Sequence, residues 1–277
     1  MKNMVITPLG TVSPYAKGDK NCPGYLIEYG DYKYLFDCGN GITRLMNFPN
    51  DLRNLTIFLS HLHPDHCSDV SSIAQALYVY KRLGYIDENV EIYIPNKDSR
   101  KEEIHIDGNK NDHNDWGYTK TIVKQTLDYE YLKNFEGNYP VTFIGYDNIE
   151  YKKDDLTIKS LQVPHQISAY AFRIDSNAGS VVYSGDTGNS DELKEFAKDC
   201  DLFICESTFL RGQFRSSNTH LYAYEAATIA KEANVRKLLL THFWPELDKT
   251  LYLNEAKEIF ENTEVAEEGK KLILKRD

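Results

Sequence analysis

Hydrophobic and polar positions along the chain predict a run of strands first, and then strands that alternate with helices. The segment GYLIEYGDYKYLFDCG has two strand-like runs around Gly30-Asp31, and this pattern predicts a hairpin. NLTIFLS reads as a buried strand, and DVSSIAQALYVYKRL after it has apolar residues at helical spacing. Further strands are predicted in VEIYIP, VTFIGY, LTIKSLQVP, YAFRID and SVVYSGD.

The second half alternates more regularly. A short helix over residues 190–197 is followed by the strand DLFICES, the helix LYAYEAATIAKEAN, the strand KLLLTHF, the helix NEAKEIFEN and the closing strand KLILKR. Sheets followed by alternating strands and helices predict an α/β protein in which two packed sheets have helices outside, a four-layer α-β-β-α sandwich. We expect one domain over residues 1–277, with a polar insert at about 96–138 that is assigned no firm structure.

Composition is that of an ordinary soluble protein with a sizeable core, because 41% of the 277 residues are hydrophobic and 27% are charged. The apolar runs are too short for a membrane span, and MKNMVITPLG is too brief and polar for a secretory signal. We therefore expect a cytoplasmic protein without membrane contact. The five cysteines form no CxxC pair, so a metal would be bound by nitrogen and oxygen atoms.

The net charge of −10 disfavours long nucleic acid as a partner, because a large phosphate backbone would be repelled. A small anionic substrate is still compatible with this charge. Two divalent cations would reverse the sign of the local field whatever the charge of the whole protein.

The stretch SHLHPDHCSD concentrates residues that bind metals. His61 and His63 are two apart at a predicted strand end, so their side chains point the same way, and Asp65 and His66 follow on the turn. Imidazole and carboxylate ligands suit zinc, manganese or iron, and open coordination positions make such a site catalytic. Four ligand-type residues in six positions favour a metal site over ordinary core or surface histidines.

Three later residues strengthen this interpretation. His165, Asp186 and His242 each follow a predicted strand. Each is weak evidence alone, but together they supply the remaining ligands of a two-metal centre at one edge of the sandwich.

The run HLHPDH, together with His165, Asp186 in YSGDTG and His242 in LLTHF, resembles the metallo-β-lactamase superfamily across nearly the whole chain. The resemblance implies two divalent metal ions, with Zn²⁺ expected first and Mn²⁺ as the alternative. It implies one site formed by His61, His63 and His165, a second formed by Asp65, His66 and His242, and Asp186 as the bridge.

Such a centre implies hydrolysis. Two cations ~3.5–4 Å apart lower the pKa of a bridging water and stabilise charge on the attacked centre and the leaving oxygen. Asp65, a ligand beside the nucleophile, is the candidate for orienting it.

Two further segments, ICESTF and THLYAYEAATIAKEANVRKLLLTHF, resemble the ribonuclease Z branch of the superfamily. The resemblance makes Glu206 and His220 a catalytic pair. His220 would protonate or stabilise the leaving oxygen, and Glu206 would hold its other ring nitrogen. The competing interpretation is structural, with Glu206 as a helix cap and His220 on the surface.

Three departures argue against a transfer-RNA maturase. These enzymes carry a long arm, commonly between the counterparts of His165 and Asp186, and here only about twenty residues separate the two. Their histidine-serine-threonine motif reads His220-Leu221-Tyr222, and the protein is acidic. What remains is similar to the arm-less cyclic-mononucleotide phosphodiesterases, including the anti-Pycsar nucleases, which open 3′,5′-cyclic nucleotides to 5′-monophosphates and are commonly homodimers.

The expected function is therefore hydrolysis of 3′,5′-cyclic mononucleotides by a dinuclear phosphodiesterase. Trp116 and Tyr118 are candidates for stacking on the base, which contributes ~1–3 kcal/mol, although ordinary packing or a dimer contact also accounts for them. The alternatives are a ribonuclease Z-like endonuclease that processes RNA 3′ ends, a lactone or thioester hydrolase, and a non-catalytic metal-binding protein.

Overall fold

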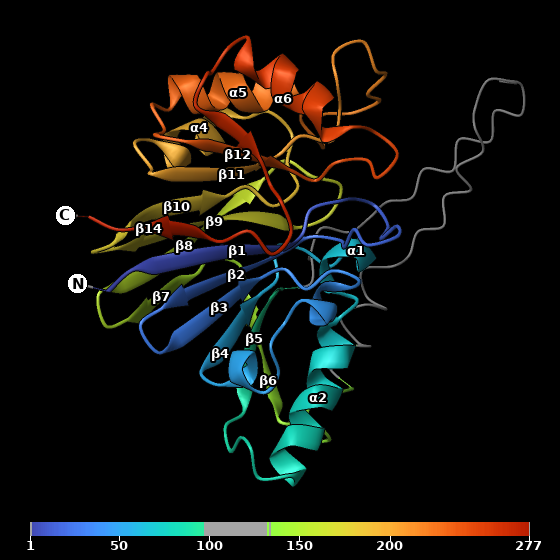
Figure 1. Ribbon diagram of the computed structural model, residues 1–277, viewed down its shortest axis with the longest axis vertical. Coiled ribbons are helices and arrows are strands. Elements are labelled where there is room, and N and C mark those ends of the chain that lie inside the picture. Colours follow the sequence, from blue (N-terminus) through green and yellow to red (C-terminus); the bar gives the residue numbers. More distant parts are fainter. Residues whose placement is uncertain (1, 97–131, 133, 277) are drawn as a thin grey trace, which may run out of the picture.

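Two seven-stranded β-sheets face each other in the computed structural model, which describes residues 2–96, 132 and 134–276 (Figure 1). The first sheet contains, in spatial order, β14 (Leu272–Leu274), β1 (Met4–Gly10), β2 (Gly24–Tyr29), β3 (Tyr32–Phe36), β4 (Leu55–Phe58), β5 (Val90–Pro95) and β6 (Val141–Tyr146). The second contains β13 (Thr263–Val265), β12 (Leu238–Thr241), β11 (Leu202–Glu206), β10 (Gly179–Tyr183), β9 (Ala169–Ser176), β8 (Leu156–Val163) and β7 (Glu150–Lys153).

Helices cover the outer face of each sheet. The first sheet is covered by α2 (Val70–Arg82), and the second by α4 (Asp191–Ala197), α5 (Ala223–Glu232) and α6 (Lys249–Lys257) (Figure 1). The short helices η1 (Ile42–Arg44), η2 (Asn50–Leu52) and α1 (Pro64–Cys67) lie in the connections. The predicted α-β-β-α sandwich is confirmed.

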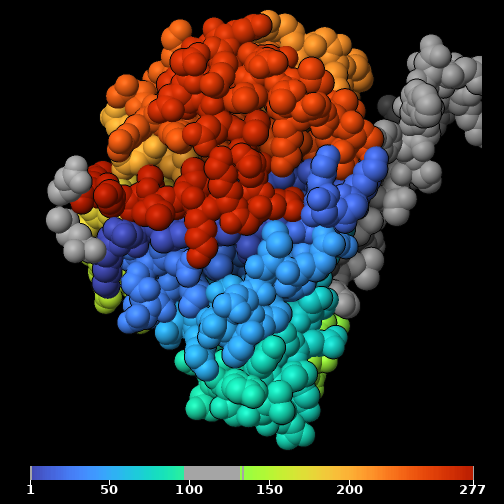
Figure 2. Space-filling model, viewed as in Figure 1, coloured from blue at the N-terminus to red at the C-terminus, as the bar shows by residue number. Residues whose placement is uncertain are grey.

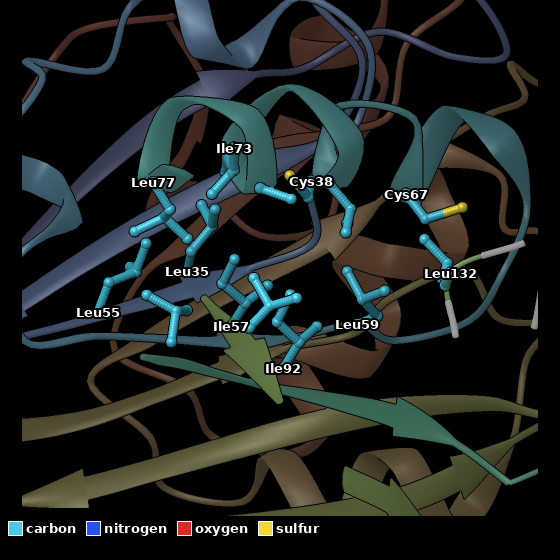
Figure 3. Close-up of a cluster of buried hydrophobic side chains, with 14 of the residues drawn as sticks. Leu35, Cys38, Leu55, Ile57, Leu59, Cys67, Ile73, Leu77, Ile92 and Leu132 are labelled. Carbon is cyan, nitrogen blue, oxygen red and sulfur yellow. The ribbon is translucent and has the colours of Figure 1, made fainter. Parts of the chain in front are cut away.

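The alternation of side chains along each strand creates separate layers of core. In β3, Leu35 faces α2 while its neighbour Phe36 packs between the sheets, as the period of two requires. Figure 3 shows Ile73 and Leu77 of α2 above Leu35 and Ile57. Each sheet is therefore buried on both faces, which explains why the strands read as nearly continuous apolar runs.

Parallel pairing brings several strand ends to one edge. β3, β4, β5 and β6 pair in parallel in the first sheet, as do β10, β11, β12 and β13 in the second. The carboxyl ends of parallel strands meet at the same edge, so residues that directly follow these strands gather there.

The two ends of the chain pair with each other. β14, the predicted closing strand, lies antiparallel to β1, with Met4 opposite Leu274. Figure 2 shows the C-terminal residues in red directly against the N-terminal strand in blue. The sequence pattern did not predict β1, whose segment MVITPLG carries a proline and no clear alternation.

One predicted helix is displaced. The helix expected over NEAKEIFEN begins earlier, at Lys249, because the Asp248 carboxylate accepts a hydrogen bond from the Thr250 amide at 2.9 Å and caps it. It ends at Lys257, and Ile259 and Phe260 beyond it turn onto the core of the second sheet.

None of the helices in the described residues combines the length and the apolar character that a membrane span requires.

Leu77 tests the packing of α2 on the first sheet. Its side chain is fully buried, so Leu77→Ala should lower the free energy of unfolding by about 2–5 kcal/mol through lost burial and a residual cavity. Val79→Ala is the control on the same helix, because Val79 is 49% exposed and its truncation should cost less than about 0.5 kcal/mol. Urea unfolding measures both, and equal losses would contradict the packing described.

Candidate metal centre

The sheet edge brings the predicted ligand residues together. His61 lies beyond β4, His165 beyond β8, Asp186 beyond β10, and His242 directly after β12. Their donor atoms form two groups, each with all members within 4.8 Å of one another: His61, His63, His165 and Asp186 in the first, and Asp65, His66 and His242 in the second.

The first group has the dimensions of one tetrahedral site. The Nδ1 atom of His63 lies 3.0 Å from Nε2 of His61 and 3.1 Å from Nε2 of His165. Two nitrogens bound to the same zinc at 2.0–2.1 Å are about 3.3 Å apart at the tetrahedral angle. These three nitrogens therefore converge as the ligands of one ion do.

Asp186, a member of the first group, also lies beside the second, and the donor atoms of Asp186, His220 and His242 form a further group within 4.8 Å of one another. Nε2 of His66 and Nε2 of His242 are 3.3 Å apart, and Asp65 Oδ2 lies 3.6 and 3.7 Å from them. Asp186 Oδ1 is 3.2 Å from His66 Nε2 and 3.0 Å from His242 Nε2, whereas its Oδ2 is 3.6 Å from His61 Nε2. Asp186 Oδ1 is buried yet accepts no hydrogen bond from the described residues, as expected of an oxygen that binds a cation.

Outer hydrogen bonds fix the tautomers of His61 and His66. Ser60 Oγ donates to Asp37 Oδ2 at 2.8 Å, so it accepts from His61 Nδ1–H at 2.9 Å. His66 Nδ1–H donates to the same Asp37 oxygen at 2.7 Å. Both rings therefore turn the lone pair of Nε2 toward the site.

The same arrangement holds for the ligands from the second sheet. His165 Nδ1–H donates to the Thr219 carbonyl at 2.9 Å. Thr208 Oγ1 donates to Glu206 Oε2 at 2.8 Å and accepts from His242 Nδ1–H at 2.8 Å. All four Nε2 atoms are thus free to bind a metal, and the residues present fit a dinuclear divalent centre.

Sequence reasoning missed Asp37. This fully buried carboxylate accepts bonds from the Ser60 amide and hydroxyl, His66 and the Tyr183 hydroxyl, at 2.6–2.8 Å. It directly follows β3 with φ 59°, a strained backbone angle that His242 shares at 63°. The sequence did contain an indication of this role, because Asp37 directly follows an apolar strand, as His242 does.

Burial and neighbouring charges set the protonation of the ligands. Burial lowers the pKa of His61 and His165, and that of His63 to about 4, so these rings are neutral and able to coordinate. Burial also opposes the charged forms of His66 and His242, but the attraction of Asp186 outweighs it and raises their pKa, to about 10 for His242. The same carboxylate would attract a bound cation, which would take the place of the second ring proton on Nε2.

Glu206 and His220 form the predicted pair beside these groups. His220 Nδ1–H donates to Glu206 Oε1 at 2.9 Å, and Glu206 also accepts from the amides of Thr187, Thr208 and Leu221. Burial alone would lower the pKa of His220, but the Glu206 carboxylate raises it. Glu206 caps none of the described helices, and its carboxylate shifts His220 toward the protonated form.

A cleft of about 860 Å³ opens onto His220 and His242. Tyr15, Phe209 and Trp244 contribute aromatic rings to it, and the rest of its wall combines apolar residues with hydroxyl and charged side chains. At the rim, the Glu246 carboxylate accepts hydrogen bonds from the Tyr15 hydroxyl at 2.7 Å and from the Lys17 ammonium at 2.8 Å. Trp116 and Tyr118, the predicted stacking residues, lie outside the described residues, as does most of the expected insert.

A family model described as the beta-lactamase superfamily domain matches residues 32–243. The chain belongs to this superfamily. It is 30% identical over 240 residues to the probable metallo-hydrolase YhfI of Bacillus subtilis, covering 86% of each chain. It is 28% identical over 305 residues to a ribonuclease Z of Archaeoglobus fulgidus, covering 95% of each.

The fold agrees with these relatives. The crystal structure of YhfI, a metallo-beta-lactamase fold protein from Bacillus subtilis, superposes with a TM-score of 0.81 at 26% identity, over 98% of this chain and 99% of that one. The predicted superfamily and its ribonuclease Z-like branch are confirmed, and the protein is a metal-dependent hydrolase.

Asp37 tests the outer hydrogen bonds. Asp37→Asn replaces an acceptor of four hydrogen bonds by an amide, so the Kd for zinc should rise about 10–100-fold in competition with a chromophoric chelator. The control is Asp69→Asn, because Asp69 is also buried but accepts from Gly41 and Thr43. Equal affinities of the two variants for zinc would contradict this role of Asp37.

Proposed function

We propose that this protein is a dinuclear metal-dependent phosphodiesterase that hydrolyses 3′,5′-cyclic mononucleotides to 5′-monophosphates. The observation that carries the proposal is the hydrogen bond between His220 and Glu206 beside the two ligand groups. An alkoxide leaving group requires a proton, and the imidazolium form of His220, which the Glu206 carboxylate stabilises, would supply it from Nε2 at the edge of the cleft. Hydrolysis of a lactone or a thioester would use the same metals and would not require the His220–Glu206 pair.

The ligand roles are part of the proposal. Two divalent cations, zinc in first place because of the donor set, would polarise the phosphate and activate water. They would be bound by His61, His63 and His165 on one side, by Asp65, His66 and His242 on the other, and by Asp186 between them.

Asp65 would orient the attacking water. Its Oδ2 accepts a hydrogen bond from Ser13 Oγ at 2.9 Å and faces His66 and His242. Burial opposes ionisation of Asp65, but the attraction of His66 prevails and lowers its pKa to about 2. We therefore propose that Asp65 aligns the attacking water as a hydrogen-bond acceptor. With so low a pKa, its carboxylate would not keep the proton that the water loses.

The surroundings of the site support a small substrate. The cleft of about 860 Å³ lies within the size range of small-molecule sites, roughly 300–1,000 Å³. Between His165 and Asp186, where transfer-RNA enzymes commonly carry their arm, the chain forms only the β9–β10 hairpin. The net charge of −10 also opposes a long phosphate backbone.

RNA 3′-end processing is the second candidate, because a ribonuclease Z is among the relatives at 28% identity. Incubation with a precursor transfer RNA separates the two functions. Endonucleolytic cleavage at the 3′ side without turnover of cyclic nucleotides would replace the first proposal by this one.

The reaction is tested with a panel of 3′,5′-cyclic nucleotides and zinc- or manganese-loaded protein, followed by chromatography. We expect metal-dependent release of 5′-monophosphates, and no release by Asp65→Ala because both a ligand and the residue that orients the nucleophile are lost. Circular dichroism verifies that the variant is folded. Full activity of folded Asp65→Ala would contradict the proposed centre.

His220 is tested by varying the leaving group. His220→Ala should slow hydrolysis of a cyclic nucleotide about 10²–10⁴-fold, because the leaving alkoxide loses its proton donor. Bis(p-nitrophenyl) phosphate, whose leaving group needs no proton, should be hydrolysed at nearly the rate of the unmodified protein. Equal slowing of both substrates would assign His220 to the structure of the site and not to proton transfer.

Three expectations from the sequence stay predictions: zinc in preference to manganese, a homodimer, and a cytoplasmic location. Metal analysis of protein purified without added metal, light scattering coupled to size exclusion, and cell fractionation test them in turn.

A further inference from the structure

A row of rings leads from the second ligand group into the cleft. The His242 and His220 rings are stacked, with centroids 5.5 Å apart and planes 19° from parallel. Phe209 lies 6.3 Å from His220, and Trp244 lies 5.7 Å from Phe209. Trp244 ends the row at the rim with 36% of its surface exposed. The cleft therefore offers aromatic surface that begins beside the proposed proton donor.

The backbone fixes both outer rings. The Phe209 amide donates to the Leu221 carbonyl at 3.0 Å, and the Phe209 carbonyl accepts from the Ala223 amide at 2.9 Å. Trp244 follows Phe243, whose amide and carbonyl bond to Thr11 and Ser13 at 3.0 and 2.9 Å. A ligand that used these rings would meet a surface whose backbone is already ordered.

The charges of the cleft suit a ligand with one phosphate. Arg215 lines the cleft, but its guanidinium makes two hydrogen bonds to Glu225, at 2.5 and 3.1 Å, and donates to the His220 carbonyl at 2.7 Å. Glu246 adds a negative charge at the rim. Among the described residues, no arginine of the cleft is therefore free to bind a second phosphate, because the guanidinium of Arg215 is already bonded to Glu225 and to the His220 carbonyl. This favours a mononucleotide over an oligonucleotide.

We propose that the ring of Trp244, which Phe209 contacts edge-on with the two ring planes at 65°, forms the platform on which the base of a nucleotide substrate stacks, while its phosphate lies at the two ligand groups. The inference rests on the phosphodiesterase function proposed above. Aromatic rings stack on any base, so the platform would bind mononucleotides with little preference for base identity. Serine and threonine hydroxyls on the cleft wall, at Ser216, Ser217 and Thr219, match the polar sugar better than an apolar ligand.

Tryptophan fluorescence tests the platform directly. The chain has two tryptophans, so Trp116→Phe leaves Trp244 as the sole indole reporter. Titration of this zinc-loaded protein with adenosine 5′-monophosphate should quench Trp244 fluorescence with saturation, whereas ribose 5-phosphate, which has the phosphate and no base, should not. Equal effects of the two ligands, or no quenching by the nucleotide, would overturn the proposal.

Substitution of Trp244 measures its contribution. Trp244→Leu should raise the Kd for adenosine 5′-monophosphate about tenfold, equivalent to 1.4 kcal/mol and within the range for stacking on a base. Binding of ribose 5-phosphate should not change, and Trp244→Phe should restore most of the affinity for the nucleotide. The matched control is Phe214→Ala, because Phe214 is 86% exposed and does not line the cleft. An unchanged Kd in folded Trp244→Leu would contradict the platform.

The two proposals fail separately. Nucleotide quenching of Trp244 without hydrolysis of any cyclic nucleotide would keep the platform and reject the proposed reaction. Hydrolysis with an unchanged KM in Trp244→Leu would keep the reaction and reject the platform. If Trp244 fluorescence changes with protein concentration but does not respond to the nucleotide, a second copy of the chain covers Trp244. That result would also reject the platform. If Trp244→Leu does not fold, the Trp116→Phe titration decides.

Discussion

The convergence of imidazole lone pairs on the two oxygens of Asp186 is the constraint on which the site depends. The Nε2 atoms of His66 and His242 lie 3.3 Å apart, and as neutral rings whose protons are held on Nδ1 they cannot hydrogen-bond to each other. Asp37, Thr208 and the Thr219 carbonyl accept the Nδ1 protons of His66, His242 and His165. The Nε2 atoms of these rings therefore face the centre together with the Asp186 carboxylate, an arrangement that favours a bound cation. The buried, unpaired Oδ1 of Asp186 has the same requirement.

The sandwich meets this requirement through parallel pairing. β4 supplies its ligands from one sheet, and β8, β10 and β12 supply theirs from the other, so opposite sheets face each other across the centre. Asp37 after β3 and His242 after β12 adopt left-handed backbone angles. Such angles cost on the order of 1–3 kcal/mol each, and the surrounding sheets stabilise them.

The metal centre and the residues around it differ in charge and in shape. The protein as a whole is acidic, and the proposed attraction for a phosphate is confined to the metal centre. The Glu206–His220 pair and the aromatic row lie on one side of the centre. Between His165 and Asp186, the position where transfer-RNA enzymes commonly carry their arm, the chain forms only the short β9–β10 hairpin. These features are the basis of the proposal that the substrate is a compact phosphodiester.

The sequence by itself determined most of the strands, the sandwich and the clustering of ligand-type residues, because alternation, strand ends and the HLHPDH spacing are local patterns. It did not predict β1, β7, β13 or the start of α6, where pairing with neighbouring strands and a single cap decide. Only the tertiary structure revealed the role of Asp37, and the meeting of Phe209 with Trp244, which lie 35 positions apart in the chain. A hydrogen-bond network and a cleft wall are formed by residues from separate elements, so no local pattern records them.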